Sequence, residues 1–262
     1  MSKRWPTLSL ALVATAMVAM SSGCGGGGDD ADASSTVDPL AAGAGTYFTS
    51  DFSSSDAAFY KVDGFSGETE QQPTKSEGAS GVTRCPALAA MDTRPDGMVL
   101  AVAKRGAALY ETNPRNSLCR LVAALPETMA AIAVRADGRI FTVSATNKLY
   151  QWDALGRQLA VAPLLCASAG ACPVRGLDFS PAGTLFAIVA PGLWSRIDTA
   201  TAQLTGVRTG VGLSDDFDID TQGTVRGLAG NELRLFDLTG LQSGRAVNVF
   251  GGTAFATGLV HR

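Results

Sequence analysis

Residues 176–188 read GLDFSPAGTLFAI, and residues 193–198 continue with LWSRID. The first stretch contains an apolar run, a polar turn with Gly183, and a second apolar run, which together predict a β-hairpin. The second stretch predicts a third strand that ends at Asp198, where a short carboxylate can accept hydrogen bonds from the turn that follows. This segment therefore predicts a unit of antiparallel strands.

The same unit recurs along the chain. The third-strand phrase is written FYKVD, LYETN, LYQWD, LWSRID and LRLFD, at Tyr60, Tyr110, Tyr150, Trp194 and Arg234. Its steps of 50, 40, 44 and 40 residues match the period of a four-stranded propeller blade. The hairpin turn recurs as well, with its glycine at Gly97, Gly138, Gly183 and Gly223. We therefore expect an all-β domain over residues 45–262, a five-bladed β-propeller with four-stranded antiparallel blades.

The two phrases differ in number, because there are five third strands and only four hairpins. The missing inner strand has a candidate at the far end of the chain, where ATGLVHR at residues 256–262 matches the start of RGLDFSP at residues 175–181. We expect this C-terminal strand to pair with the N-terminal blade, whose outer strands lie between residues 47 and 72. Such closure removes the exposed strand edges that invite aggregation.

The repeated phrases resemble those of the WD40, YVTN and NHL-type propeller superfamily, over about 215 residues. The resemblance implies the architecture and leaves the function open, because this superfold hosts enzymes, scaffolds and receptors. The dipeptide Trp152-Asp153 is the only WD pair in the chain, which argues against membership of the strict WD40 family.

The first 23 residues predict a secretion signal. Lys3 and Arg4 precede an apolar stretch at residues 8–20 that is too short to span a bilayer as a helix. The following Ser-Ser-Gly-Cys resembles the lipobox of bacterial lipoproteins, although Ser21 stands where that motif usually has Leu. The resemblance implies that Cys24 becomes the lipidated first residue. The alternative is an ordinary signal peptide with Cys24 as a spare thiol.

Residues 24–44 are rich in Gly, Asp, Ser and Ala, with little to bury, and predict a disordered tether. By resemblance to Gram-negative lipoproteins, Gly25 in place of Asp after the lipidated residue implies an outer-membrane lipoprotein of the cell envelope. The chain has 21 basic and 24 acidic residues, and removal of the leader leaves a net charge of about −5. This balance argues against nucleic-acid binding. We also expect a monomer that contacts the membrane through its N-terminal lipid.

The remaining cysteines predict two disulfides in an oxidising compartment. They are Cys85, Cys119, Cys166 and Cys172. Four thiols allow three pairings, and the expected geometry favours Cys85 with Cys119 and Cys166 with Cys172. A metal site is disfavoured because no CxxC pair occurs and His261 is the only histidine. No metal or cofactor is expected, and the position of His261 near the chain end disfavours a nucleophile that needs a histidine base.

One carboxylate recurs five residues before the hairpin glycine, at Asp92, Asp178 and Asp218, with Ala133 in the remaining repeat. These positions converge near the central channel of a propeller. They could provide the paired carboxylates of a glycoside hydrolase, which stand about 5–9.5 Å apart. They could instead accept hydrogen bonds from their own hairpin or the neighbouring blade. We favour the structural interpretation, because catalytic residues normally break a repeat.

A second acidic pattern, Asp216, Asp218 and Asp220, imitates the start of a calcium loop. The imitation fails at the sixth and twelfth positions, where Thr221 and Gly227 replace the required Gly and Glu. The sequence therefore disfavours an EF-hand.

The loops that join second to third strands and one blade to the next predict a binding face. Their polar residues are Arg84, Lys104, Arg105, Glu127, Asn147, Lys148, Arg175, Asp215 and Asn231. Mixed charge of this kind suits a protein or glycan partner, and it equally suits an ordinary solvated rim. The sequence therefore predicts a lipid-anchored, non-enzymatic binding or scaffold module. The alternative is an envelope carbohydrate-active hydrolase that uses the recurring carboxylates.

Overall fold

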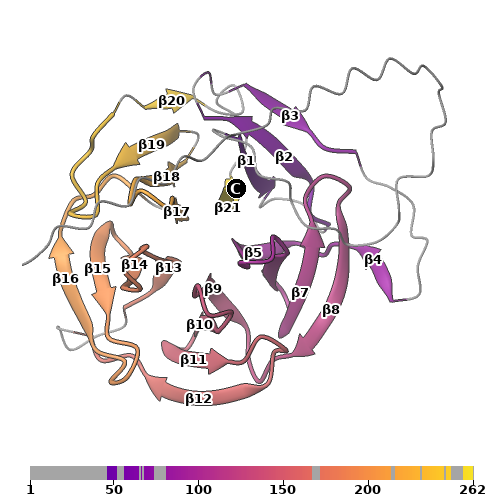
Figure 1. Cartoon of the computed structure of the whole chain (residues 1–262), viewed down its shortest axis with the longest axis horizontal. Helices are drawn as coiled ribbons and strands as arrows, with labels where there is room; N and C mark the ends of the chain where they lie inside the picture. The colour runs from indigo at the N-terminus through magenta and orange to yellow at the C-terminus, as the bar shows by residue number, and fades with distance from the viewer. Residues whose placement is uncertain are drawn as a thin grey trace, which may run out of the picture. The chain divides into compact units, whose positions relative to one another are not determined.

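The computed structural model describes ten segments, all within one compact unit, Ser34–Arg262. They are residues 46–51, 56–64, 66, 68–73, 81–166, 172–213, 216–230, 232–244, 246–248 and 256–261. The predicted leader, the tether and Cys24 lie outside these residues. The described chain forms five antiparallel sheets arranged as a five-bladed propeller (Figure 1), which confirms the predicted fold class. In this part of the chain, no helix is long and apolar enough to cross a membrane.

Each sheet is one blade. Blade 1 consists of β21 (Ala256–His261), β1 (Thr46–Asp51), β2 (Phe59–Asp63) and β3 (Thr69–Gln71). Blade 2 consists of β5 (Leu88–Thr93), β6 (Val99–Ala103), β7 (Ala108–Asn113) and β8 (Leu118–Ala124), with β4 (Val82–Arg84) outside them. Blade 3 consists of β9 (Met129–Val134), β10 (Ile140–Ser144), β11 (Lys148–Trp152) and β12 (Gln158–Pro163). Blade 4 consists of β13 (Val174–Phe179), β14 (Leu185–Val189), β15 (Leu193–Ile197) and β16 (Leu204–Arg208). Blade 5 consists of β17 (Phe217–Ile219), β18 (Val225–Ala229), β19 (Glu232–Phe236) and β20 (Val247–Asn248).

The ring closes as the sequence predicts. Strand β21 pairs antiparallel with β1, with Phe48 opposite Val260 and Thr49 opposite Leu259. The C-terminus thereby supplies the inner strand of blade 1, and β1, β2 and β3 follow outward. The five third-strand phrases fall on β2, β7, β11, β15 and β19, each the third strand of its blade. The first and last described strands, β1 and β21, therefore share one sheet.

Blade 2 departs from the prediction of four strands per blade. Its fifth strand, β4, pairs antiparallel with β8, with Thr83 opposite Cys119. The sequence pattern predicts no strand at residues 82–84, although the β-branched Val82 and Thr83 suit an extended edge. The disulfide between Cys85 and Cys119 closes a separation of 34 residues directly after β4. The second disulfide joins Cys166 to Cys172, so both predicted pairings are confirmed.

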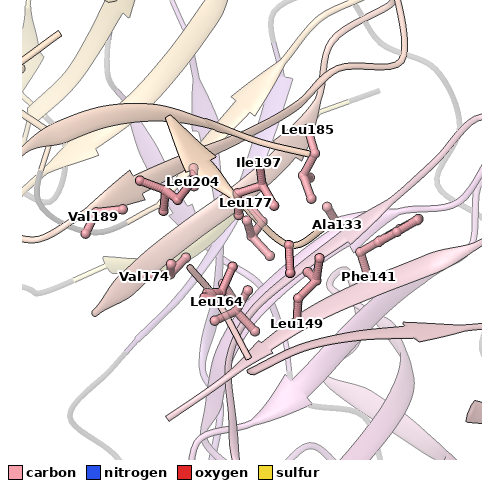
Figure 2. Close-up of a cluster of buried hydrophobic side chains, with 14 of the residues drawn as sticks. Ala133, Phe141, Leu149, Leu164, Val174, Leu177, Leu185, Val189, Ile197 and Leu204 are labelled. Atoms are coloured by element: carbon pink, nitrogen blue, oxygen red, sulfur yellow. The ribbon is translucent and has the colours of Figure 1, made fainter. Parts of the chain in front are cut away.

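The core lies between the blades. The described residues form five buried apolar clusters, one at each junction of neighbouring blades. Figure 2 shows the largest of them, where Ala133, Phe141 and Leu149 of blade 3 lie against Leu177 and Leu185 of blade 4. At the same junction the rings of Phe141 and Phe179 meet edge to face, 5.1 Å apart between centroids. Each blade thus depends on its two neighbours for burial of its apolar faces.

Candidate functional site

The propeller has two faces with different connections. The hairpin face carries the turns within each inner hairpin, such as the turn at Gly97, where Gly97 N donates to Arg94 O at 2.8 Å. The loop face carries the connections from second to third strands and from one blade to the next, which bond to one another through the backbone. Leu125 N donates to Ala107 O at 2.8 Å, and Leu164 N donates to Asn147 O at 2.9 Å. These bonds confirm that the two kinds of loop lie on one face.

The three recurring carboxylates meet at the hairpin end of the ring. Asp92, Asp178 and Asp218 all lie near the ends of the inner strands β5, β13 and β17. They line one cavity of about 310 Å³, together with Thr93 and Arg135 among other residues. All three side chains are nonetheless buried. The structure therefore brings the predicted cluster together, at the face opposite the predicted binding loops.

Two of these carboxylates join neighbouring blades. One oxygen of Asp92 accepts from Val134 N of blade 3 at 2.5 Å, and the other accepts from Thr93 N at 2.5 Å. Asp178 repeats the arrangement: its two oxygens accept from Ile219 N of blade 5 at 2.5 Å and from Phe179 N at 2.6 Å. We call such a side chain an inter-blade carboxylate. Each one satisfies backbone donors on two inner strands that would otherwise be buried without a partner.

A further inter-blade carboxylate, Asp216, closes the ring. Its side chain is buried, and its oxygens accept from Leu259 N of β21 at 3.2 Å and from Phe217 N at 3.0 Å. The sequence interpretation considered Asp216 only as an imitation of a calcium ligand. No local pattern signals this role, because the donor Leu259 N lies 43 residues further along the chain.

Burial perturbs the acidity of this cluster. Burial raises the pKa of Asp92 to about 7, and the N–H groups of Val134 and Thr93 oppose that rise. Burial also raises the pKa of Asp178 well above its usual range, and the nearby charges of Asp92 and Asp218 add to the effect. The pKa of Asp216 is raised in the same way, by burial first. A charge on any of these groups is therefore costly in the folded ring.

Two of the three acids that imitate a calcium loop bond to different partners. Asp216 bonds to the closing strand, whereas Asp220 bonds to Arg226, with Nη1 to Oδ2 at 2.9 Å. Burial raises the pKa of Asp220, but the Thr224 N–H and the Arg226 guanidinium outweigh it, so the pKa is lowered overall. No group of three acidic, histidine or cysteine side chains in the described segments could hold a metal ion.

The predicted binding residues occupy several places. Lys104 and Arg105 lie in the turn between β6 and β7, and Asn147 precedes Lys148 at the start of β11. Arg175 lies on β13, one residue from its start. Arg84 lies instead on the outer edge strand β4. Asp215 and Asn231 lie outside the described residues, and only the backbone of His261 is described, on β21.

One cluster on the loop face is fully bonded. Glu127 accepts from Lys148 Nζ at 3.0 Å, from the Tyr150 hydroxyl at 2.5 Å, and from Thr146. Although burial raises its pKa, these donors outweigh that effect and lower the pKa of Glu127 to about 2. Arg105 and Arg175 differ, since both are exposed and neither forms an ion pair with another described residue. They are therefore two cations of this face that are available to a partner.

No protein-family model matches the chain, and no curated protein matches it. Among solved structures, a protein of unknown function from Bacteroides caccae is similar, with a TM-score of 0.48 and 12% identity, over 78% of this chain and 73% of that one. Hydrazine synthase from Kuenenia stuttgartiensis has a TM-score of 0.42 and 16% identity, over 66% and 53%. The dihydro-heme d1 dehydrogenase NirN in complex with DHE has a TM-score of 0.45 and 16% identity, over 81% and 46%. This chain thus spans about half the length of the last two, and likeness at this level says nothing of their activities.

Proposed function

We propose that this chain is a non-enzymatic binding module of the bacterial cell envelope, anchored in the outer membrane through a lipid on Cys24. The observation that carries the proposal is the bonding of Asp92 and Asp178. These residues are the reagents that a hydrolase of this fold would need, and their oxygens already bond backbone donors of two blades each. These side chains hold neighbouring blades together. We therefore assign recognition of a partner to the surface loops.

The loop face is the favoured binding surface. Its connections are held by backbone bonds, and the disulfide between Cys166 and Cys172 closes a separation of only six residues within one of them. Loops ordered before binding lose less conformational entropy when a partner docks. Arg105 and Arg175 offer exposed positive charge there, which suits acidic groups on a protein or glycan.

The test is capture of partners from envelope extract on the chain immobilised without its leader. The charge reversal Arg105→Glu with Arg175→Glu should remove the partners that the unaltered chain retains. The matched control is Arg115→Glu with Arg139→Glu, two exposed arginines of the hairpin face, which should retain them. If both double variants capture the same set, the loop face is not the binding surface.

The anchor requires its own experiment. Cells that express the chain should incorporate a labelled fatty acid into it, and Cys24→Ser should abolish the label and release the protein from the membrane fraction. A labelled Cys24→Ser variant would refute lipid attachment at this residue.

The hydrolase alternative is favoured by one observation, the cavity that the three acids share. A carboxyl with a pKa of about 7, as at Asp92, suits a general acid. The triple variant Asp92→Asn, Asp178→Asn, Asp218→Asn decides between the two functions. Loss of folding supports the structural role, whereas an intact fold with lost glycan turnover would establish the enzyme.

A further inference from the structure

Exposed aliphatic side chains gather on the outer strands of blades 2 and 3. Of the six large hydrophobic residues that are exposed in the described segments, five lie there, and Leu241 lies apart in blade 5. The five are Leu121 on β8, Leu155 in the turn before β12, Leu159 and Val161 on β12, and Leu165 just after it. We call them the rim patch. Large exposed hydrophobic side chains that concentrate on one part of a surface mark an interaction site more often than scattered residues do.

The two strands that carry the rim patch adjoin. Figure 1 shows β8 and β12 in succession along the outer edge of the ring. At the turn before β12, a Cβ placed on Gly156 would lie 3.1 Å from the Cβ of Ala123 on β8. Leu155, which is 69% exposed, therefore projects from a turn that packs against the neighbouring blade. Strand β12 itself contains no charged residue between Gln158 and Pro163.

Positive charge surrounds the rim patch. Three ion pairs lie beside it, and in each the cation projects while the carboxylate is recessed. The exposed fractions of the side chains are 55% for Arg120 against 10% for Glu111, 76% for Arg157 against 22% for Asp153, and 46% for Lys148 against 19% for Glu127. A partner at the rim therefore meets aliphatic carbon with a cationic fringe. A second copy of the chain is disfavoured, because two such fringes would repel each other.

Strand addition is also disfavoured at this edge. Leu164 N donates inward to Asn147 O. Because backbone groups alternate in direction along an antiparallel strand, the backbone groups of Pro163 and Val161 face the free edge. Pro163 has no N–H to offer, and the register of β12 is broken opposite Gln151 and Trp152. Proline and bulges of this kind blunt a strand edge. The occupant must therefore use side-chain contact rather than a backbone ladder.

We propose that the rim patch rests on an anionic lipid surface, with its leucines among the acyl chains and its fringe against the headgroup phosphates. The inference rests on the proposed envelope location, because an anchored propeller is held next to such a surface. Aliphatic side chains flanked by Lys and Arg are the combination that peripheral proteins use at an interface.

The test uses the chain from residue 24 onward with Cys24→Ser, so that no acyl chain contributes. It should sediment with vesicles of phosphatidylethanolamine and phosphatidylglycerol, and less with phosphatidylcholine alone. The double variant Leu155→Ser with Leu159→Ser should bind about tenfold more weakly, since two leucines lose apolar contact. The matched control is Leu241→Ser, which changes a leucine 49% exposed on another blade and should bind fully. Added salt should weaken binding of the unaltered chain.

Three results would overturn the inference. They are absence of sedimentation with anionic vesicles, equal binding by the leucine double variant, and a dimer that the leucine double variant alone dissociates. Equal melting temperatures across the variants exclude a folding defect. The loop-face variant Arg105→Glu with Arg175→Glu should bind vesicles like the unaltered chain, so failure here is separate from failure of partner capture or of lipid attachment.

Discussion

At the residue scale, the position five residues before each hairpin glycine shows why one side chain recurs. The inner strands of blades 3 and 5 present equivalent backbone N–H groups, Val134 N and Ile219 N, to the blade before them, and an Asp at this position accepts from them. Asp92 and Asp178 do so in blades 2 and 4. The Asp therefore recurs because the contact between neighbouring blades recurs, and each such contact needs an acceptor for a buried backbone N–H.

Stability should consequently fall as the pH rises from about 4 to about 7. The pKa of Asp92 is raised from 3.8 to about 7 on folding, so its contribution is complete below the lower value and lost above the upper one. The slope is up to about 1.4 kcal/mol per pH unit for one such carboxyl. Urea denaturation at a series of pH values should show a smaller slope for Asp92→Asn.

The control for this slope is Asp137→Asn. The hydrogen bond from Arg135, outweighing partial burial, lowers the pKa of Asp137 to about 2, so its contribution is lost only below pH 4. Its replacement should leave the slope between pH 4 and 7 unchanged. A slope unaffected by Asp92→Asn would show that this carboxyl is not the source.

The period of the sequence was enough to place Asp92, Asp178 and Asp218 together, because equivalent positions of a closed repeat converge. The role of Asp216 could not be predicted. Its acceptor bond is to Leu259, 43 residues away on a strand that has no hairpin of its own. The burial that shifts these acids also depends on packing between blades, which no local pattern encodes.

At the element scale, β21 holds the ring closed. Its loss would expose the inner edge of β1 and leave Asp216 without its Leu259 donor. Deletion of the last eight residues should make the protein insoluble or sharply less stable. Removal of Arg262 alone, which leaves β21 whole, is the control, and both are compared by melting temperature. A truncated chain with an unchanged melting temperature would contradict closure by this strand.

The disulfide next to β4 should matter more than the other one. Loss of the bond between Cys85 and Cys119, which spans 34 residues, should cost about 4 kcal/mol in the loop-entropy model. Loss of the bond between Cys166 and Cys172, which spans six, should cost about 2 kcal/mol. Urea denaturation of the two double serine variants measures the difference, and equal losses would contradict this order.

The cysteine count predicted two disulfides and the expected geometry favoured the pairings that the structure contains, whereas strand β4 was not predicted. A run of three extended residues has no periodicity to detect, and it becomes a strand only because β8 offers an edge beside it. The rim patch could not be predicted for the same reason, because the exposure of its side chains depends on whether another segment of the chain packs over the outer strands.

At the scale of the whole molecule, every blade is supported by two others, so the ring should unfold as one unit. Trp194 of blade 4 is fully buried; its ring meets Phe217 of blade 5 at 4.8 Å between centroids, and its Nε1 donates to Leu238 O at 3.0 Å. Trp194→Ala should lower the free energy of unfolding by about 3–5 kcal/mol. Trp194→Phe should lower it by only about 1 kcal/mol, for the lost hydrogen bond to Leu238 O, because its ring keeps aromatic contacts. In the Trp194→Phe variant without the leader, Trp152 in blade 3 is the remaining tryptophan, and its fluorescence and the circular dichroism should report a single coincident transition. Separate transitions would show that the blades unfold independently.

Of the four repeats that contain an inner hairpin, the repeat of blade 3 alone has no inter-blade carboxylate, so the seams of the ring are unequal. Ala133 in blade 3 offers no acceptor to blade 4, and the largest apolar cluster lies at that junction. Apolar contacts weaken on cooling, whereas carboxylate seams answer to pH. The junction of blades 3 and 4 is therefore a place where the ring should loosen in the cold, whereas a rise in pH would weaken the seams at Asp92 and Asp178.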